Sequence, residues 1–300
     1  MGFVDDWTPA THFATSTTAR DFLRGLHDRG WIDGKNIKVH WKFSDGLYER
    51  RPSLIEELLR LPVDVLVVGG NKAVEDALKQ TATTPIVSVG LTAPVEQRLV
   101  KSLSRPGGNL TGIALDVGGE VESLRLGLLK QIAPRTTRVA ILAAWYETEP
   151  PRPDRKAAAA NLGIDLFVQN YKSIDQIDAA VDELVRRGAN AVFVENNQPL
   201  YQRDSMIRVV RAIERHRLPS IYLVPGASHL GGLMTYTDVR TTLIRDAALL
   251  VDRILKGANP AETPIQAPTK FELVLNQEAA RKIGLAIPEA LMLRADRVIQ

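Results

Sequence analysis

Polar side chains follow several predicted buried strands of this 300-residue chain, and they carry its most specific chemistry. Glu195, Asn196 and Asn197 come directly after the apolar stretch 191–194, which predicts a strand. A carboxylate beside two amides can hold an ammonium group through charge-assisted hydrogen bonds. Three polar residues at this position are costly to bury without partners, so they face solvent, a ligand or one another. We therefore expect a small-molecule contact at this strand exit.

Two loops in the first half of the chain carry similar side chains. Gly70 and Asn71 follow the apolar stretch 63–68, which is typical of a buried strand. A glycine allows close approach to the backbone, and an asparagine amide can both donate and accept hydrogen bonds. A tight turn followed by a helix cap would use the same two residues. Ser16 and Thr17, at the start of the first predicted helix, have the same two alternatives of ligand contact and helix cap.

Leu91 and Thr92 follow the predicted strand 86–89 and occupy the equivalent loop. Thr92 either contacts a ligand or caps the helix that Pro94 predicts, because proline suits the first turn of a helix. The unsatisfied N–H groups and the dipole of a helix start favour anionic groups. These two residues therefore extend the candidate ligand-binding surface in the first half of the chain.

Aromatic residues stand at two further strand ends. Trp145 and Tyr146 follow the predicted strand 138–142, where an aromatic pair can stack on a flat ligand or pack at the rim of the sheet. Tyr236 ends the short predicted strand 233–236, where it either contacts a ligand or packs in the core with its hydroxyl satisfied. These three residues complete the predicted ligand-binding set.

The chain lacks the residue patterns of the common catalytic and cofactor sites. It has no Gly-x-Ser-x-Gly, Gly-x-Gly-x-x-Gly or Walker-type Gly-Lys-Ser/Thr motif. It has no cysteine, and its five histidines show no metal-ligand spacing. We therefore predict a protein that is not an enzyme, with no catalytic residues, no cofactor and no metal.

The elements that must position these side chains alternate between strand-like and helix-like segments, a pattern typical of parallel sheets with crossover helices. Ala19, Phe22, Leu23 and Leu26 predict the first helix, because their spacing places them on one face. Further helices are predicted over 51–60, 72–80, 119–132, 153–162, 174–187, 200–216 and 241–256, and further strands over 110–113, 165–168, 220–223 and 271–275. The sequence therefore predicts an α/β fold with two doubly wound, Rossmann-like lobes, whose ligands bind beyond the carboxyl ends of the strands.

The start of the chain does not match a complete first strand. Only residues 2–4 could form it, and the polar, turn-rich stretch 5–11 follows. We expect the chain to begin inside or just after that strand, downstream of a natural start that includes an export signal. The longest apolar runs, such as 63–68, are too short to span a bilayer, and a net charge of +3 without a basic stripe predicts no nucleic-acid partner.

Seven segments, in order along the chain, resemble the substrate-binding proteins of ABC transporters, in their tryptophan/tyrosine-type subgroup. They are 30–37 (GWIDGKNI), 102–112 (SLSRPGGNLTG), 129–134 (LKQIAP), 251–257 (VDRILKG), 268–276 (PTKFELVLN), 280–285 (ARKIGL) and 294–299 (RADRVI). Two positions depart from the family pattern: Ala93 stands where the family usually has an aspartate, and Thr237 where it often has a glycine. The first departure removes a carboxylate from the expected ligand site.

The resemblance implies the type I periplasmic-binding-protein fold, in which two lobes are joined by a three-segment hinge and hold the ligand in a cleft between them. The first lobe would comprise 1–112 plus 237–265, and the second 113–236 plus 266–300. The implied partners are a small-molecule solute and an ABC permease with its ATPase. The implied location is periplasmic, or exported and membrane-associated through that permease, and the expected state is a monomer.

The function predicted from these observations is solute capture. The protein would bind an amino acid or another aromatic or carboxylate-bearing metabolite, close around it and deliver it to the permease. One alternative is a ligand-sensing regulatory protein of the same fold, although no DNA-binding headpiece precedes residue 20. Another alternative is a nucleotide-using α/β enzyme, which the missing phosphate-loop motifs disfavour.

Overall fold

The computed structural model describes residues 1–6, 10–95, 97–116, 118–144, 151–197, 200, 202–238 and 243–300. The chain divides into two compact units: unit 1 comprises Met1–Val117 and Arg240–Pro268, and unit 2 comprises Gly118–Val239 and Thr269–Gln300. The chain therefore passes between the units three times, at 117–118, 239–240 and 268–269. The sequence predicts these passages at 112–113, 236–237 and 265–266.

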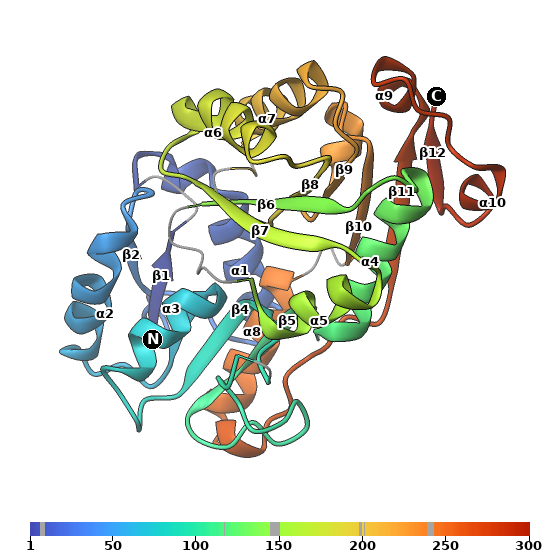
Figure 1. Ribbon diagram of the computed structural model, residues 1–300. Helices are drawn as coiled ribbons and strands as arrows, with labels where there is room; N and C mark the ends of the chain where they lie inside the picture. The colour runs from blue at the N-terminus through green and yellow to red at the C-terminus, as the bar shows by residue number, and fades with distance from the viewer. Residues whose placement is uncertain are drawn as a thin grey trace. The chain divides into compact units, whose positions relative to one another are not determined.

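Unit 1 is built on a five-stranded parallel sheet (Figure 1). Its strands lie in the order β2 (His40–Phe43), β1 (Gly2–Asp5), β3 (Leu66–Gly69), β4 (Ile86–Thr92) and β5 (Leu110–Asp116). Helices α1 (Thr17–His27) and α8 (Leu243–Leu255) pack on one face, and α2 (Arg51–Leu59) and α3 (Gly70–Leu78) pack on the other. Successive residues of β3 enter the two cores in turn, which is why that strand is apolar along its length.

Strand β1 is a full partner in this sheet. All four of its residues are buried and pair with β2, and Gly2 and Phe3 also pair with β3. A central strand needs few residues when both neighbours satisfy its backbone groups. The short apolar run 2–4 thus forms this strand together with Asp5.

Unit 2 repeats this strand order and extends it. Its strands lie in the order β12 (Arg297–Ile299), β11 (Phe271–Asn276), β10 (Met234–Asp238), β9 (Ser220–Tyr222), β8 (Ala191–Val194), β6 (Arg138–Ala144) and β7 (Asp165–Tyr171). Neighbouring strands are parallel except for the antiparallel pair β10 and β11. The order from β7 to β10 matches the order from β2 to β5 in unit 1, so the predicted α/β class with two doubly wound sheets is confirmed.

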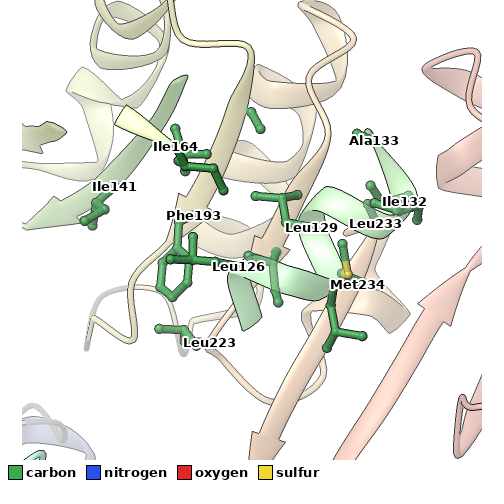
Figure 2. Packing of buried hydrophobic residues seen from close by; sticks show 14 of the residues in the cluster. Leu126, Leu129, Ile132, Ala133, Ile141, Ile164, Phe193, Leu223, Leu233 and Met234 are labelled. Atoms are coloured by element: carbon green, nitrogen blue, oxygen red, sulfur yellow. The ribbon is translucent and has the colours of Figure 1, made fainter. Parts of the chain in front are cut away.

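Helices cover both faces of the unit 2 sheet (Figure 1). Helices α4 (Gly119–Ile132) and α5 (Pro153–Asn161) lie on one face, and α6 (Ile177–Arg186) and α7 (Arg203–Arg215) lie on the other; α9 (Gln277–Lys282) and α10 (Glu289–Met292) follow β11. Figure 2 shows Leu126 and Leu129 of α4 in one apolar cluster with Ile141 of β6 and Phe193 of β8. Among the described residues, no helix is both long and apolar enough to cross a membrane.

The helix predicted from Pro94 does not form in the described residues 93–95 and 97–109. Ala93 and Arg98 have positive φ angles of 42° and 58°, a left-handed conformation that does not continue a helix. The N–H groups of Gln97 and Leu99 donate to the carbonyls of Ala93 and Pro94, which makes isolated turns only. Thr92 therefore has no such helix to cap. The other predicted helices are confirmed to within a few residues.

Candidate functional site

The start of α1 in unit 1 uses Ser16 as its N-cap. The Ser16 hydroxyl accepts a hydrogen bond from the N–H of Ala19 at 3.1 Å, and Ser16 is buried. This bond satisfies one of the free N–H groups of the first helical turn. Thr17 is the first residue of the helix. The capping alternative is thus observed for Ser16, and a ligand contact at this helix start remains a prediction.

The side chain of Asn71 joins the start of α3 to the end of β4. Its Nδ2 donates to the carbonyl of Thr92 at 2.7 Å, and its Oδ1 accepts from the N–H of Thr92 at 2.9 Å. Gly70 precedes it with a φ of +75°, a conformation that favours glycine. The side chain of Leu91 is fully buried in the core on the α2 and α3 face. The structure therefore brings these predicted residues together, but through contacts within the protein.

Asn197 plays an equivalent part in unit 2. It is 1% exposed, and its Oδ1 accepts a hydrogen bond of 2.6 Å from the N–H of Ala144, the last residue of β6. The side chain thus ties the exit of β8 to the end of the neighbouring strand. Asn196, one residue earlier, is half-buried, and among the described residues its side-chain amide has no hydrogen-bond partner. Asn196 is therefore the amide at this strand exit that is available to a solute.

Glu195 is paired with a cation of its own unit. The guanidinium of Arg155, in the first turn of α5, donates to Oε2 of Glu195. The other oxygen, Oε1, accepts only a long hydrogen bond of 3.4 Å from the N–H of Asn196. The sequence predicts an ammonium partner at Glu195, and Arg155 supplies a positive charge from within the protein. Oε1 remains the better acceptor for a donor group of a ligand.

A buried cluster of charged groups supports Arg155. Nε of Arg155 donates to Oε2 of Glu122 at 2.7 Å, and Nη2 donates to Oε1 at 3.2 Å. Arg125 and Arg152 also donate to Oε1 of Glu122, at 2.9 and 3.2 Å. Arg152 pairs in turn with Asp154 at 2.9 Å. We call Glu122, Arg125, Arg152, Asp154, Arg155 and Glu195 the charged cluster; its three arginines balance its three carboxylates.

The charges of this cluster depend on one another. Burial by itself would raise the pKa of Glu122, but the guanidinium groups of Arg155, Arg125 and Arg152 lower that pKa to about 2. Burial by itself would lower the pKa of Arg155, but the carboxylates of Glu122 and Glu195 raise it above its usual range. Arg155 also lies over the ring of Phe193, with its guanidinium carbon 4.5 Å from the ring centre. Glu122 and Arg155 are therefore both ionised at neutral pH.

The sequence reasoning missed Glu122, Arg125, Arg152 and Arg155, although a signal was present for two of them. Glu122 and Arg125 fall within the stripe of α4 that also carries Leu126, Leu129 and Ile132. A pair of opposite charges on the apolar stripe of a helix indicates a buried ion pair rather than a solvated face. No comparable local pattern marks Arg152 and Arg155.

The remaining predicted residues differ in what the structure shows of them. The sequence predicts Tyr236 at the end of its strand, but it lies in the middle of β10, half-buried, and its ring stacks on Phe271 with ring centres 5.3 Å apart. Trp145 and Tyr146 lie outside the described residues. Among the described residues, no group of three or more histidine, aspartate or glutamate side chains could hold a metal ion.

The chain passes three times between two doubly wound units, and proteins of known structure have the same architecture. The ABC domain in complex with L-Trp from Streptococcus pneumoniae has a TM-score of 0.79 and 22% identity, with 99% of this chain and 98% of that chain covered. A conserved domain protein from Vibrio cholerae has a TM-score of 0.80 and 22% identity, with the same coverage. The fold is that of the periplasmic binding proteins.

Within that class the family is defined by sequence. The family model described as "ABC transporter substrate binding protein" matches residues 8–299, and the chain belongs to this family. A tyrosine-binding protein from Clostridioides difficile is 22% identical over 283 residues, which cover 91% of this chain and 78% of that protein. The predicted family resemblance is therefore confirmed.

Proposed function

We propose that the protein captures an aromatic amino acid, such as L-tryptophan or L-tyrosine, for an ABC uptake system. The observation that carries this proposal is the family match over residues 8–299. The solute class is supported by two relatives, one named as tyrosine-binding and one solved in complex with L-Trp. Delivery to an ABC permease with its ATPase, and a periplasmic or exported location, belong to the same proposal.

The proposed contacts lie at the strand exits of each unit. In unit 2, Oε1 of Glu195 and the side-chain amide of Asn196 are the available polar groups, and Tyr236 offers an aromatic edge. Because Arg155 neutralises Glu195, we expect Glu195 to accept one hydrogen bond rather than to balance a full ligand charge. In unit 1, we propose Ser16, Thr17, Gly70, Asn71, Leu91 and Thr92, with Leu91 acting through its backbone because its side chain is buried.

A thermal-shift screen against the common amino acids, aromatic metabolites and nucleotides tests this function. A solute at 100 times its dissociation constant should stabilise the fold by about 2.7 kcal/mol, provided that it binds only the folded state. We expect L-tryptophan or L-tyrosine to raise the melting temperature. A shift with nucleotides alone would contradict solute capture and favour the nucleotide-using enzyme.

Asn196→Ala tests the placement of the site. Loss of one hydrogen bond to the solute should weaken its affinity roughly tenfold, about 1.4 kcal/mol, with the melting temperature of the free protein unchanged. Asn161→Ala is the matched control, because Asn161 is exposed at the end of α5 in the same unit. Equal affinities of both variants in titration calorimetry would refute the contact at Asn196.

Movement of the two units about the three connecting segments on solute binding is also part of the proposal. Ligand can drive such a movement only through its higher affinity for one of the two states. Small-angle scattering with and without saturating L-tryptophan should show a fall in the radius of gyration.

A further inference from the structure

Arg125 contacts the chain next to all three passages between the units. It lies on α4, which begins at Gly119 directly after the first passage. Its Nε donates at 3.3 Å to the carbonyl of Tyr236, which lies three residues before the end of unit 2 at Val239. Its guanidinium carbon lies 5.9 Å from the ring centre of Phe271, two residues after unit 2 resumes at Thr269. Arg125 is buried, so these contacts are made away from solvent.

We call the stretches of chain beside the three passages the connecting segments. The second and third of them include β10 and β11, which pair with each other in unit 2. Strands β10 and β11 are antiparallel, with Asp238 opposite Phe271 and Tyr236 opposite Leu273. The rings of Tyr236 and Phe271 stack on one face of this pair. Helix α4, which follows the first segment, is not part of the sheet. Arg125 therefore makes a polar contact from α4 to both of the other segments, beside the apolar cluster that Leu126 and Leu129 share with these strands.

In unit 1 the pairing of the segments is different. The N–H of Ala114 in β5 donates to the carbonyl of Gln266 at 2.9 Å, and the N–H of Gln266 donates to the carbonyl of Gly112 at 2.9 Å. These bonds join the first segment to the third by backbone. In unit 2 the corresponding link from the first segment uses the side chain of Arg125. A substitution can remove that link without changing the backbone.

Arg125 is also connected to the candidate solute contacts at β8. Its Nη1 donates to Oε1 of Glu122 at 2.9 Å, Glu122 is bound on two atoms by Arg155, and Arg155 is bound to Glu195. Glu122, Arg125 and Arg155 are buried and ion-paired with one another, so shifting one of them leaves a charge unpaired in a low-dielectric environment. A chain of ion pairs thus runs from Glu195 through Arg155 and Glu122 to Arg125.

We propose that Arg125 is a positioning residue that fixes the three connecting segments to one another in unit 2, and that the charged cluster couples this anchor to the solute contacts at Glu195. The coupling rests on the proposed solute-binding function; the anchor does not. Such coupling requires an element whose equilibrium is biased from both sites, and the connecting segments are that element.

Hydrogen exchange in the solute-free protein tests the anchor. In Arg125→Gln, amide exchange of residues 118–121, 236–238 and 269–272 should rise together, at least tenfold, while β8 keeps its protection. Arg125→Lys retains the charge beside Glu122 but not the planar guanidinium, so amide exchange in the same segments should rise less than in Arg125→Gln. Arg125→Lys replaces Arg125→Gln in this test if the latter does not fold. Arg138→Gln, which removes a half-exposed arginine of the same unit, is the control and should leave all three unchanged.

The anchor is contradicted if the amide exchange rate of any one of the three segments is unchanged. It is also contradicted if exchange rises equally throughout unit 2, which is the result expected of a residue with a merely structural role.

The coupling is tested by titrating L-tryptophan and L-tyrosine. Arg125→Gln should bind the solute at least tenfold more weakly than the parent protein, whereas Arg138→Gln should match it; equal affinity for Arg125→Gln overturns the coupling. If the parent protein binds neither amino acid, the proposed function fails, and the exchange data still decide the anchor.

Discussion

Glu122 is a carboxylate with no exposed surface that accepts hydrogen bonds from three arginines. Removing one partner of such a group costs more than a surface ion pair is worth, because the remaining charges stay buried without compensation. Its pKa in the folded state is about 2, against 4.5 for an ordinary glutamate. The folded state therefore favours the ionised form, and protonation of Glu122 opposes folding.

This difference predicts a specific dependence of stability on pH. The contribution of Glu122 is complete above pH 4.5 and is lost as the pH falls towards 2, because the unfolded chain binds the proton first. Between pH 5 and pH 2, the stability difference between the parent protein and Glu122→Gln should shrink by about 3 kcal/mol. Urea unfolding across this range measures it, with exposed Glu289→Gln as the control. A constant difference would show that Glu122 is not ionised by its arginines.

At the scale of elements, α1 and α8 pack closely because Gly25 faces Ala248. A Cβ added at Gly25 would lie 2.8 Å from the Cβ of Ala248 and 3.2 Å from the carbonyl oxygen of Arg245. The second atom belongs to the backbone, so the helices would have to separate. Gly127 in α4 has no atom within 4 Å of its added Cβ.

These two glycines predict opposite effects of the same substitution. Gly25→Ala should destabilise the protein by about 1–3 kcal/mol, because overpacking outweighs the helix propensity gained. Gly127→Ala should stabilise it by up to about 1 kcal/mol, because alanine favours the helix and meets no obstacle. Chemical denaturation of both variants gives the comparison, and effects of the same sign would contradict the close packing of α1 on α8.

Most elements could be predicted because apolar periodicity is a local property; α4 and β8 have the predicted bounds. The absence of a helix after Pro94 could not be predicted, because the positive φ at Ala93 is not a preference of alanine but a product of the surrounding fold. The polar residues at the strand exits could likewise be placed from the sequence. Their partners could not: Glu122, Arg155 and Glu195 are far apart along the chain, and only the packing of α4, α5 and β8 brings them together.

At the scale of the whole molecule, each unit has its own apolar cores on the two faces of its own sheet. Gly112 in β5 lies opposite Ser88 in β4, and a Cβ there would overlap the backbone of Ser88. The steric clash introduced by Gly112→Ala therefore lies within unit 1.

We expect Gly112→Ala to lower the stability of unit 1 more than that of unit 2. Trp31 and Trp41, the tryptophans among the described residues, both belong to unit 1, so intrinsic fluorescence reports on that unit. The urea midpoint by fluorescence should fall by a clear margin, whereas exchange protection of β8 in unit 2 should persist at urea concentrations that unfold unit 1. Coincident loss of both signals would mean that the units unfold as one cooperative system.

The return of the chain to unit 1 has a consequence for its synthesis on the ribosome. Helix α8 buries Ala247, Ala248, Leu250, Val251 and Ile254 against the face of the sheet that also carries α1. That face stays uncovered until the ribosome has passed residue 254 and the segment has left the exit tunnel. Unit 1 therefore cannot complete this core until residues 118–239 of unit 2 have been synthesised, and until then the nascent protein presents an apolar surface.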